Sequence, residues 1–286
     1  MVINDLKMKF LTTILIILLS FQSFAQQDSE ATPERYTAHN KGKIYVYWGG
    51  NRDYYTHSDI HFKGDGYDFT IYDVKAHDKP KGWHIDYINP ANMTIPQTDL
   101  RIGYFITDHY NVSLGVDHMK YVMTQNEKVR YSGNYPDRGS YGEASADNEV
   151  YLTEDFLTFE HTDGLNYINA EIARVDDFSR YLGIRNTDVF QVNITEGVGA
   201  GVLFPKTNAK LLGKERHDDF HVSGFGLSAK VGLNLTFFKY FFVQGELKGG
   251  YINMGDIKTT YSNSDKASQH FGFFETVIAV GGIFRI

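Results

Sequence analysis

Two adjoining stretches of the chain alternate between apolar and polar side chains for longer than the strands of most soluble sheets. From Phe225 to Phe237 every second residue is apolar, and after a short turn the alternation resumes from Phe241 to Tyr251. A period of two places the apolar side chains on one face of a strand. Globular strands average about five or six residues, whereas a tilted strand that crosses a bilayer needs about nine to eleven. The two stretches therefore predict a hairpin of membrane-spanning strands.

The polar face of this hairpin carries charges that would be enclosed if the apolar face contacts lipid. Lys230 lies on the polar face of the first strand, and Glu246 and Lys248 lie on the polar face of the second. A register that keeps the two apolar faces together brings Lys230 close to Glu246 or Lys248. We therefore expect a barrel interior that is polar and plugged by side chains.

A second hairpin of the same kind is predicted over 99–123. Arg101 belongs to the polar face of its first strand and Asp117 to the polar face of its second, and Asp108-His109 forms the turn. A register that keeps the apolar faces together can set Arg101 opposite Asp117 as an interior ion pair. The predicted lumenal polar network consists of Arg101, Asp117, Lys230, Glu246 and Lys248.

The connections between strands are of two lengths. Tight turns alternate with long polar segments, which is the pattern of outer-membrane barrels with short periplasmic turns and long extracellular loops. Glu196 interrupts the apolar face of the strand expected over 190–204, an exception for which we expect a bulge. The fold class predicted is all-β: a transmembrane antiparallel up-and-down barrel of about eight strands, with segments 67–75 and 151–160 as extracellular hairpins. A ten-strand barrel that includes both segments is the alternative. The remaining strands are expected over 44–50, 165–175 and 271–286.

The composition fits a barrel and argues against several other classes. A mean hydropathy of −0.35 is compatible with membrane insertion, because a barrel strand presents only every second side chain to lipid. The 20 Tyr and 21 Phe suit aromatic girdles. A net charge of −7 without a basic stripe argues against nucleic-acid binding, and the lack of cysteine excludes disulfides and thiolate metal sites.

The beginning of the sequence predicts export. Lys7 and Lys9 precede the apolar run Phe10–Leu19, and Ser23 and Ala25 supply small residues for cleavage before Gln26. This arrangement is typical of a secretory signal peptide, and the run is too short to span a bilayer comfortably. We predict a signal peptide at 1–25, a short periplasmic segment at 26–42 and one barrel domain at 43–286.

The last strand ends in a pattern that resembles the terminal signal by which the barrel assembly machinery recognises its clients. Gly281, Phe284 and Ile286 occupy the three characteristic positions, although the final residue of such signals is more often Phe. Together with segments 58–78, 117–122 and 233–254, the mature chain resembles small outer-membrane β-barrel proteins of Bacteroidota, within the broad OmpA/OmpW-like superfamily. The resemblance covers 43–286 and implies the location and the fold more than an activity.

A metal site is one hypothesis for the loops. His57, Asp59 and His61 share one face of an extended segment, at a spacing that a metal ion could use. A solvated hairpin surface is the plainer interpretation, since no compact ligand motif is present. We expect no cofactor.

A lipid A-modifying hydrolase is one alternative function. Ser113, Asp117 and His118 supply the residue types of a catalytic triad. Adjacent residues of a strand face opposite sides, so His118 would face lipid rather than an interior Ser113. The sequence therefore favours a barrel without catalytic residues.

The function expected is a structural or surface-interaction role, with lipid or a small ligand bound through extracellular loops. A narrow pore for small solutes is the other alternative. The partners expected are outer-membrane lipid and lipopolysaccharide, and the barrel assembly machinery during biogenesis.

Overall fold

The computed structural model describes residues 39–81, 97–137, 140–141, 148–217 and 219–285. These residues belong to one compact unit. The expected signal peptide at 1–25 and almost all of the expected segment 26–42 lie outside the described residues. No helix within the described ranges is long and apolar enough to cross a membrane.

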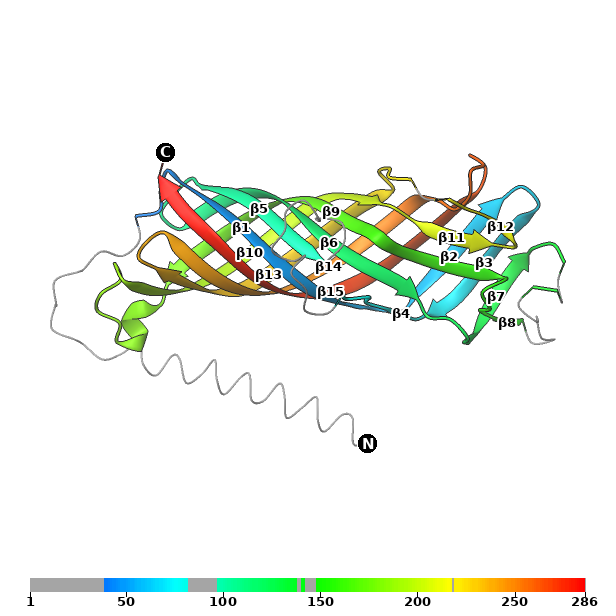
Figure 1. The fold of residues 1–286 in the computed structure, drawn as a ribbon, viewed down its shortest axis with the longest axis horizontal. Helices are drawn as coiled ribbons and strands as arrows, with labels where there is room; N and C mark the ends of the chain where they lie inside the picture. Colours follow the sequence, from blue (N-terminus) through cyan, green and yellow to red (C-terminus); the bar gives the residue numbers. More distant parts are fainter. Residues whose placement is uncertain (1–38, 82–96, 138–139, 142–147, 218, 286) are drawn as a thin grey trace, which may run out of the picture. The chain divides into compact units, whose positions relative to one another are not determined.

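Eight antiparallel strands form a closed ring in which each strand pairs with the next ring strand along the chain and the last pairs with the first (Figure 1). The last strand of the ring pairs with the first along thirteen residue pairs, from Lys43 with Arg285 to Tyr55 with Phe273. The predicted eight-strand barrel is therefore confirmed, and the ten-strand alternative is wrong. The ring consists of β1 (Lys43–Tyr55), β5 (Thr98–Phe105), β6 (Tyr110–Met123), β9 (Leu157–Asp177), β10 (Phe190–Pro205), β13 (Gly224–Phe237), β14 (Phe241–Lys258) and β15 (Lys266–Arg285).

The two ends of the ring differ in their connections. One end, named here the turn end, holds the connections 106–109, 178–189 and 238–240 together with the first residue of β1 and the last of β15. In the tightest of these connections, the Tyr240 amide bonds to the Phe237 carbonyl, and Phe238 and Lys239 between them have positive φ, as the central residues of a type I′ turn require. The opposite end, named the loop end, carries the long connections.

Short additional strands at the loop end continue the barrel wall beyond the ring (Figure 1). The segment expected over 67–75 is indeed a strand, but that expected over 151–160 is interrupted between 151 and 157. The segment 67–75 stays outside the ring, whereas residues 157–160 of the other segment form the beginning of ring strand β9, so neither adds a strand to the ring. The additional strands are β2 (Ser58–Gly64), β3 (Tyr67–Val74), β4 (Ala76–His77), β7 (Lys128–Asn134), β8 (Glu149–Tyr151), β11 (Asn208–Leu211) and β12 (Lys214–His217).

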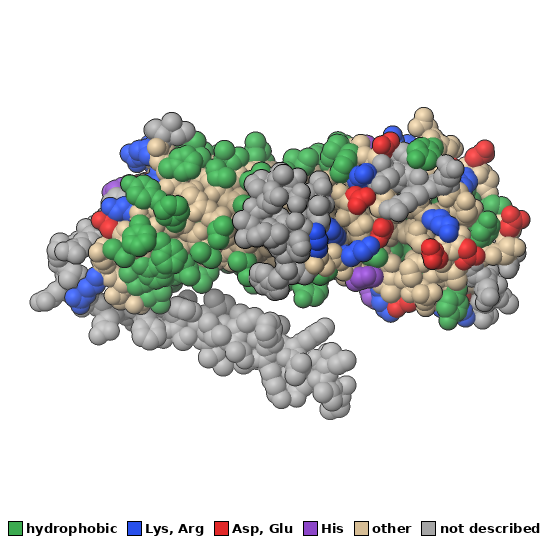
Figure 2. Space-filling view, in the orientation of Figure 1, with side chains coloured by type: hydrophobic (Ala, Val, Ile, Leu, Met, Phe, Trp, Pro, Cys, Tyr) green, Lys and Arg blue, Asp and Glu red, His purple; other side chains and the backbone are tan. Residues whose placement is uncertain are grey.

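The polarity of the inner and outer faces inverts along the barrel. Towards the turn end, apolar side chains such as Leu114 and Leu227 are exposed on the outside, whereas Arg101 is buried inside. Towards the loop end the order is reversed, and aromatic side chains such as Phe62 and Phe159 are buried in an internal core. Figure 2 shows the same division on one face, with apolar side chains gathered on the turn-end half and charged ones on the other.

The expected bulge at Glu196 is wrong. The pairing of β10 with β9 and with β13 runs without a register shift, and Glu196 lies exposed on the outer face. It pairs in register with Arg174 of β9, which lies three residues from the end of that strand. The exception is therefore a charge beside an opposite charge on the outer surface, rather than a backbone irregularity.

Candidate functional site

A network of buried charges fills the interior of the ring. Its centre is Glu171 of β9, whose carboxylate oxygens lie 2.7 Å from Lys230 Nζ, 2.9 Å from Arg101 Nη2 and 3.3 Å from Lys248 Nζ. These three cations come from β13, β5 and β14, so one carboxylate joins four strands. Buried charges are tolerated when each is paired with good geometry, and breaking such a pair is costly.

The structure brings all five residues of the predicted lumenal network inside the barrel. Asp117 lies 3.3 Å from Arg101 Nη2 and 2.6 Å from Lys248 Nζ, and Lys230 lies 3.0 Å from Glu246. The partner in register with Arg101 is Gly115, not Asp117 as we expected. A Cβ on Gly115 would lie 2.7 Å from the guanidinium, so glycine makes room for the diagonal ion pair.

Besides Asp53, three buried carboxylates near this network were not singled out from the sequence. Glu171 falls on the inner face of β9, and Glu275 does so on β15, while Asp99 lies in register with Asp117. The available signal was a charged residue on the polar face of an expected strand, the pattern that did identify Lys230 and Glu246. It could have been applied to segments 165–175 and 271–286 as well.

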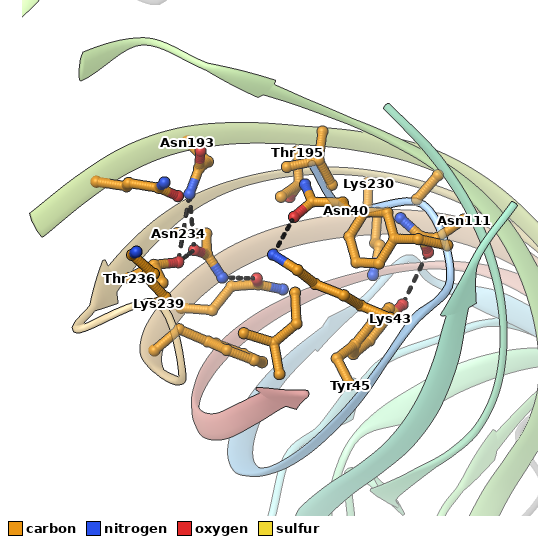
Figure 3. Close-up of a pocket in the computed structure, with 17 residues that line it drawn as sticks. Asn40, Lys43, Tyr45, Asn111, Asn193, Thr195, Lys230, Asn234, Thr236 and Lys239 are labelled. Carbon is orange, nitrogen blue, oxygen red and sulfur yellow. Dashed lines mark hydrogen bonds between the residues drawn. The ribbon is translucent and has the colours of Figure 1, made fainter. Parts of the chain in front are cut away.

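Below the network, towards the turn end, the interior holds a small polar vestibule of about 60 Å³. Amide and hydroxyl groups line it and bond to one another, with Asn193 donating to Asn234 over 3.2 Å and Asn234 to Gln244 over 2.8 Å (Figure 3). The volume admits a few water molecules. At its inner end Tyr45 and Lys230 line the wall.

Above the network, towards the loop end, four carboxylates gather on β1, β5, β6 and β15. Oxygens of Asp99, Asp117 and Glu275 all lie within 4.8 Å of one another. Asp53 pairs in register with Glu275. The cation nearest to Glu275 is Lys248, at 3.5 Å. We name Asp53, Asp99, Asp117 and Glu275 the junction cluster, because it separates the polar interior from the apolar core of the loop end.

The residues of the metal hypothesis lie on the outer face of the loop-end extension. His57 pairs with Asp73 at 2.9 Å and His61 with Asp68 at 2.7 Å, while Asp59 accepts a hydrogen bond from the Asp73 amide. The bond from His61 holds the pKa of the Asp68 carboxyl below its usual value. The structure thus gives each histidine its own carboxylate partner.

The three residues considered for a hydrolase occupy both faces of β6. Ser113 points inward and accepts a hydrogen bond from Arg101 over 3.1 Å. His118 lies on the opposite face, where its Nδ1 is 2.6 Å from Asn166 Oδ1. His118 is buried, not exposed to the surroundings as we expected.

The residues of the predicted assembly signal lie at the turn end of β15. Gly281 faces inward, where a Cβ would come within 2.3 Å of the Phe242 ring, and Phe284 is exposed on the outside. Ile286 lies outside the described residues.

The ring and its interior define the class of the protein: a closed eight-stranded antiparallel barrel with a polar, side-chain-filled interior. No protein-family model matches the chain, and no curated protein matches it in sequence. Solved structures similar to it include outer membrane protein OprG of Pseudomonas aeruginosa, at 10% identity and a TM-score of 0.38, covering 87% of this chain and 99% of that one.

Two further structures are similar at the same low level. Outer membrane protease OmpT of Escherichia coli has 12% identity and a TM-score of 0.34, covering 88% of this chain and 100% of that one. Ail of Yersinia pestis has 10% identity and a TM-score of 0.31, covering 85% and 99%. What this chain does has to be inferred from its own barrel.

Proposed function

We propose that the chain is an outer-membrane barrel of a Gram-negative bacterium, with a non-conducting interior and a structural or surface-interaction role. The inversion of polarity along the barrel carries this proposal. A surface that contacts water buries its apolar side chains, as the loop-end extension does. The turn-end half exposes them and buries its charges, an arrangement that is stable when hydrocarbon surrounds it.

The height of the exposed apolar band agrees with a bilayer. Aromatic or apolar side chains mark its two edges ten residues apart on three neighbouring strands: Ile44 to Tyr54, Phe241 to Tyr251 and Phe274 to Phe284. Ten residues at a rise of 3.3 Å and a tilt of ~40° span about 25 Å, the height of the apolar band of outer-membrane barrels. We name the edge formed by Tyr54, Tyr251 and Phe274 the upper girdle.

A filled interior supports a barrel that does not conduct. Eight strands enclose a space that side chains can fill. Here the vestibule ends at the charged network, the charged side chains of the network are nearly inaccessible, and an apolar core follows above them. A solute would have to displace ion pairs that join four strands. We therefore favour the structural role over a pore.

The loop-end extension is the part available to partners. It projects beyond the upper girdle and carries charged side chains of both signs on its outside, among them Lys63 and Lys79. We propose that lipopolysaccharide meets such cations through its phosphates, and that the barrel assembly machinery inserts the chain through the signal at its end. Export by a signal peptide at 1–25 and membership of the Bacteroidota group that the sequence resembles belong to the same proposal.

Two measurements test the proposal. The full chain, expressed in a Gram-negative host, should fractionate with the outer membrane after detergent extraction of the inner membrane. The purified barrel in a planar bilayer should give no conductance steps, while a porin added to the same bilayer as a control gives them. Recovery of the mature chain as soluble periplasmic protein would overturn the location, and discrete steps from the purified barrel would overturn the non-conducting interior.

A further inference from the structure

The junction cluster contains buried oxygens without partners among the described residues. Asp99 Oδ2 and Glu275 Oε1 have neither a hydrogen-bond donor nor a cation, although Glu275 is fully buried and Asp99 is 1% exposed. Asn51 donates its amide to Asp99 over 3.1 Å, yet its own Oδ1 accepts nothing. A buried carboxylate oxygen without a partner carries a large desolvation cost.

The charges of the interior do not balance. Among the residues that the structure describes, six buried carboxylates face it, of Asp53, Asp99, Asp117, Glu171, Glu246 and Glu275, against three buried cations, of Arg101, Lys230 and Lys248. The excess of 6 − 3 = 3 negative charges gathers at the junction cluster, because Glu171 and Glu246 are already in contact with cations. Of the cations in the described part of the chain, only Lys248 lies within 4 Å of both Asp117 and Glu275.

We propose that the junction cluster binds one hard divalent cation, with calcium as the best fit, through Asp99, Asp117, Glu275 and the side-chain oxygen of Asn51. All four donors are oxygen atoms, which calcium prefers and which suit zinc less well. Calcium binds oxygens at about 2.3–2.6 Å, so two ligands on opposite sides of it lie about 5 Å apart. The carboxylate oxygens of Asp99, Asp117 and Glu275 all lie within 4.8 Å of one another, close enough for one such ion to contact all three.

The ion accounts for features that the protein alone leaves unbalanced. Asp99, Asp117 and Glu275 with Lys248 sum to −3 + 1 = −2, which one divalent cation neutralises. The third negative charge of the excess stays on Asp53, whose carboxylate accepts a hydrogen bond from Gln97 over 2.9 Å. It also joins β1 and β15, the strands that close the ring, to β5 and β6. The cation would therefore link the strands on both sides of the β1–β15 pairing that closes the ring.

Direct metal analysis tests the site on the intact protein. The purified chain in detergent solution is dialysed against EDTA and then against calcium-free buffer, and it is titrated with calcium chloride while bound metal and melting temperature are followed. We expect about one calcium ion per chain and a melting temperature that rises with calcium. Magnesium chloride in a parallel titration is expected to bind at least tenfold more weakly.

Matched variants distinguish a bound calcium ion from bound protons as the positive charge that balances the junction cluster. Glu275→Gln keeps the shape of the side chain and should weaken calcium binding at least tenfold, and Asp99→Asn should act likewise. Asp265→Asn is the control, because Asp265 is a buried carboxylate outside the cluster that already pairs with Lys214 at 2.7 Å. The control should retain the ion.

Three outcomes would overturn the proposal. The first is no calcium bound to the wild type, in which case protons balance the cluster and Glu275→Gln should melt at a higher temperature. The second is calcium bound equally by the wild type and Glu275→Gln, which places the ion elsewhere. The third is magnesium binding as tightly as calcium, which refutes the choice of calcium. The wild-type titration decides the first and third even where a variant fails to fold. None of these readouts depends on conductance or location.

Discussion

A lysine in the middle of the apolar band should destabilise the barrel strongly in a bilayer and hardly at all if the band faces water. Leu247 of β14 is half exposed on the outer face, six residues from Phe241 and four from Tyr251. At a rise of 3.3 Å and a tilt of ~40° these separations place it about 15 Å and 10 Å from the two edges. A lysine or arginine at the midplane of a barrel costs about 2–4 kcal/mol, so Leu247→Lys should lower the free energy of unfolding by about 3 kcal/mol.

The assay is equilibrium unfolding by denaturant in phospholipid vesicles. Tyr261→Lys is the matched control, because Tyr261 is exposed in the connection 259–265 at the loop end. An exposed position in water changes stability by no more than about 0.5 kcal/mol. Equal effects of the two variants would refute the assignment of the outer band to lipid.

Three other perturbations probe the interior. Glu171→Gln should cost about 3 kcal/mol in the same unfolding assay, because three buried cations lose a shared carboxylate, and a loss below about 1 kcal/mol would contradict the central role of Glu171. Phe159→Ala should cost about 3–5 kcal/mol and expose the loop end to trypsin before the ring, whereas simultaneous cleavage of both would show that the core is not separate. His161 lies in β9 beyond the upper girdle, and burial lowers its pKa to about 3. The unfolded chain takes up this proton below about pH 6.5, so stability is full above that pH and falls by about 1.4 kcal/mol per unit as the pH is lowered. His161→Gln should remove that slope, measured by trypsin resistance of the loop end from pH 7 to pH 5, and an unchanged slope would assign it to other groups.

The ring could be predicted from the sequence because its strands are long and alternate strictly. In a strand with one apolar face, the polarity of each residue indicates which face it lies on. The alternation in Phe225–Phe237 and Phe241–Tyr251 is therefore enough to predict two strands and the turn between them. The closing pair of β1 with β15 is not local, yet it follows once the strand number is even and every short turn lies at the same end. The expected positions of the ring strands agree with the structure for this reason.

The loop-end extension could not be predicted in the same detail. Its strands are short, and their partners lie far away in the sequence, as β2 with β15 and β11 with β9 show. The interruption between 151 and 157 separates two stretches that read as one apolar segment, and only the tertiary pairing distinguishes them. The local sequence pattern predicted the strand β3, but it did not predict the apolar core of the loop end against which β3 packs.

The charged interior was predicted in kind but not in its connections. The alternation of polar and apolar residues placed Arg101, Asp117 and Lys230 on the inner face. The register of one strand with its neighbour could not show that Glu171 contacts both Arg101 and Lys230. A closed ring brings strands that are not neighbours across a narrow interior, and such contacts leave no trace in the pattern of either strand. Glu171 was therefore missed because its partners are not on the strands next to it, whereas Asp99 and Glu275 lie in register with Asp117 and Lys248 on neighbouring strands and could have been found from the polar-face pattern.

The junction cluster lies where the two polarity patterns of the barrel meet, and this position explains its composition. On the turn-end side the apolar side chains lie on the outer face, so the alternating inner positions are polar. On the loop-end side the outer face is polar and meets water, so the apolar side chains are buried inside. Glu275 stands directly after Phe274 of the upper girdle, and Phe273 before it already belongs to the apolar core. A carboxylate at such a boundary has polar neighbours mainly on the side of the network. Asp53 lies in register with Glu275 and accepts a hydrogen bond from Gln97 over 2.9 Å. Cations from the network below reach the boundary poorly, so the compensating charge has to come from outside the chain, which is why we assign it to a bound cation.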